Sequence, residues 1–403
     1  MSSPTPNVPT FGRRELLGSM GIAAGTALLH ETIPAAANPA ANVADRGSSI
    51  RITDLKPTIC GDRVYIKIET NHNVTGWGEI KGVIPSVAKT LVMAMFELLD
   101  GQNPTRIEHL WQVLYRSHRN HRGGPFMLHC ISGIDMALWD ITGKLWGVPV
   151  YRLLGGPTRD KIRVYPTDKA VKLGTGPKRH SSNPQTIDQL VASVRSARER
   201  VGPDGAVMFD AHSALPPATL MQFASAVEPY DLLFLEEPVV PGNIDTFKKI
   251  RQAVKIPLAT GERDRTIWGI LPYLKEQIVD VVQPDSGYTG GISQSKKIAT
   301  LAEAWYVPIA PHNTQSYLGM TASFHVAASV PLFLIHESYD DEVLGRIVRY
   351  NWSKDADGYA SLPEGTGLCV DIDEQALAEV AADPPQRFKW QHHRLPDGSV
   401  ADY

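Results

Sequence analysis

The chain from residue 50 to residue 156 shows first a strand-like and then a helical pattern of apolar positions. Residues 63–69 alternate apolar and polar side chains, a polar turn follows, and 76–79 complete a hairpin, which is typical of antiparallel strands. Apolar residues then recur with a helical period at 86–99, 106–118 and 127–145. Strands followed by helices over about 100 residues predict an α+β domain at 50–156.

Beyond residue 157, short apolar runs alternate with helical stretches. The runs lie at 206–209, 232–235, 257–260, 278–283, 307–310 and 332–335. The ionisable residues that closely follow them are Asp210, Glu236, Glu262, Asp285, His312 and Glu337. They are about 25 positions apart, the length of one strand, one helix and two loops in a (β/α)8 barrel. We therefore predict an α/β fold with a TIM-like barrel at 157–350, and these residues at the carboxyl ends of its strands, where barrel enzymes carry their active sites.

The start of the barrel departs from this spacing. Residues 163–167 and 170–174 both look like barrel strands, yet only Asp168 and Lys169 separate them. A parallel crossover takes a dozen or more residues. We therefore predict either that the first helix of the barrel is missing or that one of the two runs is not a barrel strand.

The first 44 residues differ from the rest of the chain. Arg13 and Arg14 precede an uncharged stretch at 16–29, and alanine- and proline-rich sequence follows, with small-x-small sites ending near Ala37 or Ala44. This order is typical of an export signal, and the arginine pair indicates the twin-arginine route. The apolar stretch is shorter than a membrane span of about 20 residues. We expect an exported, periplasmic protein; a disordered tail with a chance arginine pair is the alternative.

Composition narrows the classes of partner and site. Of the 403 residues, 43% are hydrophobic and 21% are charged, which excludes a disordered or collagen-like chain. The formal net charge of −3 provides no basic field for nucleic acid or an anionic membrane, so we expect neither partner. Cys60, Cys130 and Cys369 are scattered, which argues against a disulfide framework or a thiolate zinc site.

Three of the strand-end residues are carboxylates on consecutive strands. Asp210, Glu236 and Glu262 would converge from adjacent sectors of the barrel rim. Unpaired carboxylates so placed repel one another unless a cation lies between them. Hard oxygen ligands without cysteine favour Mg²⁺. We predict a magnesium site here; separate salt bridges with nearby basic residues are the alternative.

Acid–base residues lie at the same rim. Asp285 and His312 end neighbouring runs, so the carboxylate can hold one imidazole nitrogen and leave the other as a base near neutral pH. His212 lies two residues after Asp210 and points to the same side by strand alternation. Glu337 would reach in from the eighth strand end.

Together these groups suit the removal of a proton alpha to a carboxylate. The resulting dianionic enediolate needs a metal ion and a hydrogen-bond donor for stabilisation. If the second acid/base group protonates a β-hydroxyl, water leaves and the reaction is a dehydration. If it reprotonates carbon, the reaction is an epimerisation. The residues alone favour neither outcome.

Several segments also match a known family in sequence. They lie at 76–79, 133–156, 209–212, 235–239, 260–263, 283–293, 310–312 and 393–403. These segments resemble the enolase superfamily, in its mandelate racemase subgroup, and most closely the D-galactonate dehydratases. The resemblance implies that residues 351–403 return to the cap formed by the first domain. It also implies a homo-oligomer, from a dimer to an octamer.

The resemblance further implies a role for each residue. The three carboxylates would bind Mg²⁺, and the base held by Asp285 would take the C2 proton. His212 would act as general acid on the C3 hydroxyl and Glu337 would donate to the enediolate, giving a 2-keto-3-deoxy acid. Gly174 replaces the second lysine of the Lys-x-Lys pair of mandelate racemases. The candidate substrate-binding residues are Lys172, Arg122 and His336.

The leading hypothesis is therefore a Mg²⁺-dependent acid-sugar dehydratase, a carbon–oxygen hydro-lyase. A hydroxy-acid racemase or epimerase of the same superfamily is one alternative. A catalytically inactive exported binding protein is another, because the first barrel helix is predicted to be missing. The loop after His312 lacks the proline-containing dehydratase pattern, which leaves the identity of the acid sugar open.

Overall fold

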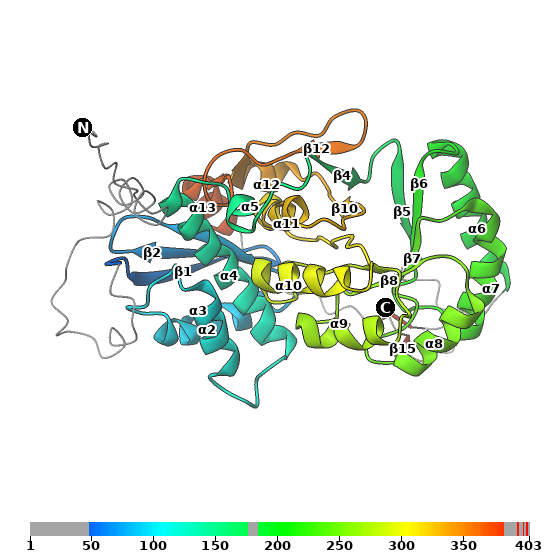
Figure 1. The fold of residues 1–403 in the computed structure, drawn as a ribbon, viewed down its shortest axis with the longest axis horizontal. Coiled ribbons are helices and arrows are strands. Elements are labelled where there is room, and N and C mark those ends of the chain that lie inside the picture. Colours follow the sequence, from blue (N-terminus) through cyan, green and yellow to red (C-terminus); the bar gives the residue numbers. More distant parts are fainter. Residues whose placement is uncertain (1–47, 176–183, 383–392, 395–397, 399, 402–403) are drawn as a thin grey trace, which may run out of the picture.

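The computed structural model describes residues 48–175, 184–382, 393–394, 398 and 400–401. An N-terminal cap, blue to cyan in Figure 1, lies beside a barrel drawn from green to orange. The predicted export signal at 1–44 and most of the 393–403 motif lie outside the described residues. Among the described residues, no helix is long and apolar enough to span a membrane.

The cap is a three-stranded antiparallel sheet covered by helices. Its strands are β1 (Ile52–Cys60), β2 (Arg63–Thr70) and β3 (Gly76–Ile80), in that order. Its helical segments are α2 (Pro85–Met95), η2 (Phe96–Leu98), α3 (Ile107–Arg116), α4 (Pro125–Trp146) and α5 (Val150–Leu153). Alternate residues of β2, among them Val64, Ile66 and Ile68, are buried in a core shared with α4. The strand-then-helix pattern of the sequence accounts for this order.

Two glycines in β3 explain how closely α4 lies against the sheet. A Cβ on Gly78 would fall 1.9 Å from the carbonyl oxygen of Gly133, and one on Gly76 would fall 2.1 Å from that of Ala137. Any larger residue would clash with the helix backbone, so glycine is required at both positions. The contact fixes the course of β3 as it leads through Glu79 toward the barrel.

The barrel is a ring of parallel strands with one interruption. Five strands pair in sequence order: β5 (Ala170–Gly174), β6 (Ala206–Asp210), β7 (Phe234–Glu236), β8 (Leu258–Thr260) and β9 (Val281–Val282). Parallel bridges extend this sheet from Val282 to Ile309 and from Ile309 to Phe333. Next comes β10 (His336–Glu337), which pairs in parallel with β4 (Lys161–Tyr165). The prediction of a (β/α)8-type barrel with an α+β cap is confirmed.

Helices cover the outside of the barrel, and a second set of side chains fills its inside. The helical segments are α6 (Pro184–Val201), α7 (Pro217–Val227), η3 (Glu228–Tyr230), α8 (Ile244–Ala253), α9 (Thr266–Lys275), α10 (Gly291–Glu303) and α11 (Tyr317–Ser329). In β6, Val207 and Phe209 pack toward the helices, whereas Ala206 and Met208 join the interior cluster. Asp210 continues the inner row because side chains alternate along a strand. The same alternation decides which residues can reach the site.

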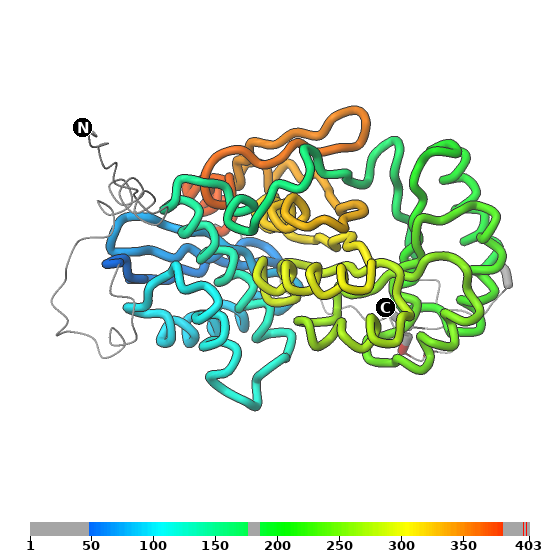
Figure 2. The backbone as a smooth tube through the Cα atoms, in the orientation of Figure 1, coloured from blue at the N-terminus to red at the C-terminus, as the bar shows by residue number. Residues whose placement is uncertain are grey.

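The ring is open between β4 and β5. The chain passes between these strands through residues 166–169 alone, and no helix lies there (Figure 2). On the edge away from β10, β4 pairs instead with the antiparallel strand β12 (Tyr359–Ser361), and β5 is an edge strand. Four residues are too few for a helical crossover. The prediction that the first barrel helix is missing is confirmed.

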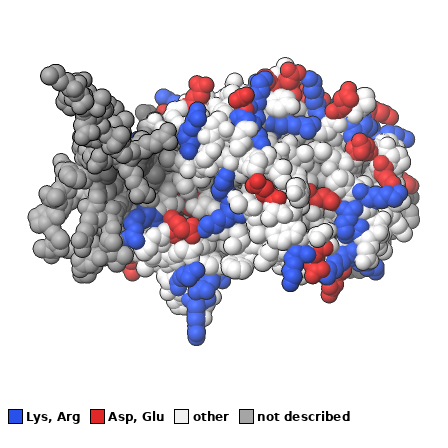
Figure 3. All heavy atoms as spheres, viewed as in Figure 1, with Lys and Arg blue, Asp and Glu red and all other residues white. Residues whose placement is uncertain are grey.

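The C-terminal part of the chain connects the barrel with the cap. Its elements are α12 (Glu342–Ile347), β11 (Val348–Tyr350), β13 (Val370–Ile372), α13 (Glu374–Ala382), β14 (His393–Arg394) and β15 (Val400–Ala401). β11 pairs with β13, and α13 packs against β1 of the cap. The Lys67 ammonium lies 2.6 Å from a Glu374 carboxylate oxygen at this junction. On the face seen in Figure 3, acidic and basic side chains are interspersed.

Candidate active site

Three carboxylates meet at the carboxyl ends of the barrel strands. Asp210 and Glu236 are the last residues of β6 and β7, and Glu262 follows β8 after Gly261. Gly261 has a φ of 137°, and a Cβ there would fall 2.9 Å from the Gln283 backbone nitrogen. One oxygen from each of the three carboxylates lies within 4.8 Å of the others. The carboxylates of three separate strands thus form one cluster.

The chemistry of this cluster fits a hard divalent cation. Burial and the charge of Asp210 raise the pKa of Glu236 to about 7, and burial raises the pKa of Glu262 to about 7. Within the described residues, the buried Oε2 atoms of both glutamates have no hydrogen-bond partner. Converging oxygen ligands with spare lone pairs are what Mg²⁺ prefers. These residues could hold that ion.

The ammonium of Lys172, on β5, lies among the carboxylates. Its Nζ is 2.9 Å from Glu236 Oε1, 3.1 Å from Glu337 Oε1 and 3.7 Å from Asp210 Oδ2. Burial would lower the pKa of Lys172, but these carboxylates hold it well above its usual range. Lys172 is therefore a cation facing the centre of the site, where a substrate carboxylate would be attracted.

His312 and Asp285 form a buried pair on the neighbouring strands. His312 Nδ1 donates to Asp285 Oδ2 at 2.7 Å, and the backbone N–H of Gly287 donates to Asp285 Oδ1 at 2.7 Å. His312 Nε2 lies 3.4 Å from Glu262 Oε2. Burial would lower the pKa of His312, but Glu262 and Asp285 raise it well above its usual range. The ring thus presents Nε2 to the carboxylate cluster, as a base would.

His212 lies beside a different carboxylate of the cluster from the one that His312 approaches. Its Nε2 is 2.9 Å from Asp210 Oδ2, and its backbone N–H donates to Asp210 Oδ1 at 2.8 Å. Burial would lower the pKa of His212, but the hydrogen bond and charge of Asp210 raise it. A Cβ on Gly174 would fall 3.3 Å from His212 Cε1. The missing second lysine thus leaves room for the His212 ring.

Glu337 is held as an acceptor. Besides Lys172, it accepts the backbone N–H of Asn313 through Oε2 at 3.2 Å. Burial would raise the pKa of Glu337, but the charges of Lys172 and His312 outweigh burial and lower it. An ionised carboxylate cannot donate a hydrogen bond, which conflicts with the donor role that the resemblance implied. The side chain beside Glu337 that can donate a hydrogen bond is Lys172, whose Nζ lies 3.1 Å from Glu337 Oε1.

The structure does not bring two of the predicted substrate-binding residues to the site. Arg122 lies on an exposed loop of the cap, with its guanidinium 5.6 Å from the Tyr115 ring centre. His336 is fully buried, and its Nε2 pairs with Ser323 Oγ at 2.8 Å while Nδ1 pairs with the Glu337 carbonyl. Alternation along the strand turns His336 away from the interior that Glu337 faces. Neither residue has a polar atom directed at the carboxylates in this structure.

Two buried amides next to the acid–base pair were missed by the sequence analysis. Gln283 and Asn313 are 0% and 2% exposed, and neither polar atom of either side chain has a partner within the described residues. Gln283 follows Val281, an interior residue, by two positions and so faces the barrel interior. Gln283 lies two positions before Asp285, so the same alternation predicts from the sequence that the two side chains point to the same side.

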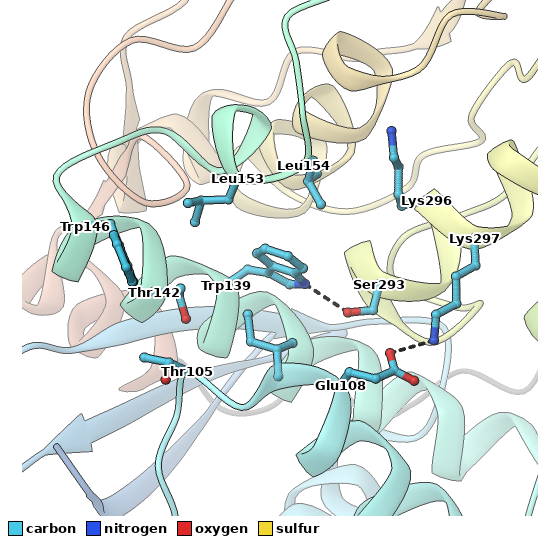
Figure 4. A pocket seen from close by; sticks show the side chains of 11 residues that line it. Thr105, Glu108, Trp139, Thr142, Trp146, Leu153, Leu154, Ser293, Lys296 and Lys297 are labelled. Atoms are coloured by element: carbon cyan, nitrogen blue, oxygen red, sulfur yellow. Dashed lines mark hydrogen bonds and ion pairs between the residues drawn. The ribbon is translucent and has the colours of Figure 1, made fainter. Parts of the chain in front are cut away.

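A hollow of about 550 Å³ lies outside this site, at the junction of cap and barrel. It is lined by α3, α4, α5 and α10, with Trp139 and Trp146 on one side and Lys296 and Lys297 on the other (Figure 4). The lining is mostly apolar and shares no residue with the carboxylate cluster. It does not provide the acid–base chemistry described above.

The chain matches known families over most of its length. Residues 60–155 match the mandelate racemase / muconate lactonizing enzyme N-terminal domain family, and residues 163–376 match the enolase C-terminal domain-like family. D-galactonate dehydratases from Ralstonia pickettii and Pectobacterium atrosepticum are 35% and 33% identical to this chain. Each alignment covers 84% of this chain and 96% of the relative.

Solved structures of related proteins share this fold. An enolase from Agrobacterium radiobacter, with sodium and L-malate bound, has a TM-score of 0.80 and 30% identity, over 88% of this chain and 100% of that one. The 3,6-anhydro-D-galactonate cycloisomerase from Zobellia galactanivorans has a TM-score of 0.76 and 28% identity, over 82% of this chain and 99% of that one.

Proposed function

Because this chain belongs to the mandelate racemase subgroup of the enolase superfamily, we propose that it is a Mg²⁺-dependent acid-sugar dehydratase acting on D-galactonate or a related aldonic acid. The proposal rests on one observation. A base candidate and an acid candidate lie against different members of one carboxylate cluster: His312 beside Glu262 and His212 beside Asp210. Such an arrangement allows a proton to be taken from one carbon while another is given to a leaving group.

The carboxylates Asp210, Glu236 and Glu262 would hold the Mg²⁺ ion. When bound, the ion would supply positive charge. This charge would offset the negative carboxylates that raise the pKa of His312, and it would stabilise the negative charge that develops on the substrate. The Lys172 ammonium would pair with the substrate carboxylate and donate to its oxygens as that charge develops. Glu337, 3.1 Å from the Lys172 ammonium, helps to hold it in place.

His312 would remove the C2 proton through Nε2. The carboxylate of Asp285 accepts from Nδ1 and so keeps the proton on that nitrogen, leaving the lone pair of Nε2 directed at the cluster. The C–H electron pair moves into the carboxylate system as the enediolate forms. His212, whose raised pKa favours the protonated form, would then donate a proton to the C3 hydroxyl as the C3–O bond breaks. Water leaves, and the resulting enol tautomerises to the 2-keto-3-deoxy acid.

The test is a 2-keto acid assay on the purified protein with Mg²⁺, over a panel of aldonic and aldaric acids that includes D-galactonate. We expect keto product from one or a few substrates, and its loss in His312→Asn. A change in optical rotation without keto product would identify a racemase or epimerase instead. Mg²⁺ and sugar-acid binding without either product would indicate an inactive binding protein.

We also propose export to the periplasm and an even-numbered homo-oligomer. The basis for export is the signal-like pattern of residues 1–44, and the basis for assembly is the family resemblance. Fractionation of cells producing the full chain, with Arg13 and Arg14 replaced by lysine as a control, tests the first. Light scattering on the purified protein tests the second, and a monomer would contradict it.

A further inference from the structure

The four residues after His312, at 313–316, form a segment that we call the base loop. Inside the barrel, its first residue, Asn313, donates its backbone N–H to Glu337. The hydroxyl of Thr314 pairs with the Tyr288 hydroxyl at 2.6 Å, and the Tyr288 ring centre lies 5.9 Å from that of His312. The backbone position of His312 therefore depends on where this loop is held.

The cap holds the base loop at two points. Lys81, directly after β3, donates from Nζ to the Thr314 carbonyl at 2.7 Å. Glu79, within β3, accepts the backbone N–H of Ser316 at 2.9 Å and its hydroxyl as well. Both contacts join residues more than two hundred positions apart in the chain. They link the cap directly to the loop that follows the proposed base.

The Glu79 contact is anchored from both sides. Glu79 is 0% exposed, and its Oε1 lies 3.0 Å from Nη1 of the buried Arg63 on β2. Ser316 is the N-cap of α11 and accepts the Leu318 N–H with its hydroxyl. A carboxylate at a helix N-terminus is stabilised by the helix dipole and by the free N–H groups. The end of β3 and the start of α11 are thus bound through one buried carboxylate.

The base loop also contacts the carboxylate that orients the base. Gln315 directs its amide Nε2 toward Asp285 Oδ2 at 3.5 Å. A Cβ on Gly287 or on Gly319 would fall 2.4 Å from Gln315 atoms, so this side chain is enclosed between two glycines. Movement of the loop would therefore push on Asp285 and change the geometry of the His312 pair.

We propose that Lys81 and Glu79 of the cap are positioning residues for His312: by holding the base loop, they set the base in its working geometry. The proposal rests on the function proposed above, in which His312 removes the C2 proton. It assigns the cap a part in the proton-transfer step, in addition to covering the barrel. Neither residue touches the carboxylate cluster in this structure, so both act through the loop.

The test compares three variants with the wild-type holoenzyme. Lys81→Met removes the Thr314 contact without leaving a buried charge unpaired, and Lys81→Arg restores a cationic donor. Trp139→Phe is the matched control, because it removes a hydrogen bond from cap to barrel, Trp139 Nε1 to Ser293 Oγ at 2.9 Å, away from the base loop. Steady-state kinetics and thermal unfolding are measured for all of them.

We expect Lys81→Met to lower kcat about tenfold with KM nearly unchanged, since small misplacement of a reacting group lowers the rate without weakening binding. Lys81→Arg should recover most of kcat, and Trp139→Phe should retain it despite a comparable loss of thermal stability. Equal kcat losses in Lys81→Met and Trp139→Phe, or an unchanged kcat in Lys81→Met, would overturn the proposal.

Absence of turnover in the wild type would contradict only the proposed function. In that case, crystal structures of wild type and Lys81→Met test whether Lys81 positions His312. A displacement of the His312 ring by about 1 Å relative to Glu262, whose Oε2 lies 3.4 Å from Nε2 here, would support positioning through the loop. An unmoved ring would overturn it.

Discussion

Replacing Asp285 with asparagine tests how His312 acquires its basic nitrogen. The change keeps the shape of the side chain in a position that is 0% exposed. Gly287 donates its N–H to Oδ1 at 2.7 Å, so this atom must remain the amide oxygen. The amide NH₂ then occupies the Oδ2 position, 2.7 Å from His312 Nδ1. His312 must accept there, which moves its proton to Nε2, the nitrogen that faces the cluster.

The expected magnitude follows from this change of tautomer. Loss of a charged hydrogen bond alone is worth about 1.5–3 kcal/mol, or about 10- to 150-fold in rate. A catalytic histidine locked in the wrong tautomer loses roughly 10⁴ in kcat. Because Gly287 fixes the orientation of the amide, the change of His312 tautomer determines the loss of kcat. We expect Asp285→Asn to lose about 10³- to 10⁴-fold in kcat.

The assay is 2-keto acid formation at saturating substrate, with ¹⁵N NMR of labelled histidine to read the tautomer. Asp135→Asn is the matched control. Asp135 is another buried aspartate, 2% exposed, and it accepts from the backbone N–H of Ser293 at 3.0 Å, outside the candidate site. Its variant should stay within a few-fold of wild type. If Asp285→Asn keeps more than a tenth of wild-type kcat while folded, the tautomer argument is wrong.

Three further predictions concern the acid, the carboxylates and the buried amide. His212→Gln should abolish keto acid formation yet retain exchange of the C2 hydrogen in D₂O, and loss of both to the same extent would argue against its role as the acid. Burial raises the pKa of both Glu236 and Glu262 to about 7. In the unfolded chain these glutamates lose their protons above about pH 4.5, whereas the metal-free folded protein keeps them up to about pH 7. The stability that these protons provide is lost as pH rises through 7. Relative to a Glu236→Gln, Glu262→Gln double variant, the unfolding temperature of the wild type in chelator should therefore fall between pH 5.5 and 8, and Mg²⁺ should restore it at pH 8; equal slopes in the two proteins would contradict this. The comparison cancels the opposite effect of the buried His129, His325 and His336, whose pKa values burial lowers to about 4. Gln283→Leu should not lower the unfolding temperature, because its two unpartnered amide atoms already cost free energy in the fold. It should lower kcat/KM about tenfold through the loss of one buried hydrogen bond to substrate, and unchanged kinetics would show that the amide does not contact it.

The sequence predicted the part of the site that depends on strand ends. Asp210 and Glu236 each end a strand, and alternation from Met208 and Phe234 in the barrel interior turns both inward. The backbone of the strand determines the direction of a side chain at such a position. The period of two and the spacing of the runs are therefore sufficient to predict that these carboxylates lie close together.

Alternation also shows where the sequence-based choice of residues failed. His336 is adjacent to Glu337 in the same strand, so the two side chains must face opposite sides. His336 packs outward against Phe324, with ring centres 4.7 Å apart, and pairs with Ser323. The two side chains therefore cannot both face the site. Arg122 failed for a different reason, since a loop of the cap has no period from which its direction could be predicted.

Contacts that depend on tertiary packing were not accessible from the sequence. No local pattern predicts that Lys172 Nζ lies within 4 Å of three carboxylates, or that His212 bonds to Asp210 through Nε2. These distances depend on the tilt of the strands and on side-chain rotamers. The link from Glu79 to Ser316 is another such contact, because its partners lie in different domains.

The open seam between β4 and β5 is bridged by side chains at the level of the active site. Lys172 is on β5, yet its ammonium lies 3.1 Å from Glu337 on β10, the parallel partner of β4. The same ammonium lies 5.7 Å from the ring centre of Tyr165, the last residue of β4. An ion pair with both members largely buried is costly to break, because separation leaves an uncompensated charge. Lys172 therefore links β5 to β10 across the seam, where no helical crossover does, and the functional groups of the site stay together although β4 and β5 share no parallel ladder.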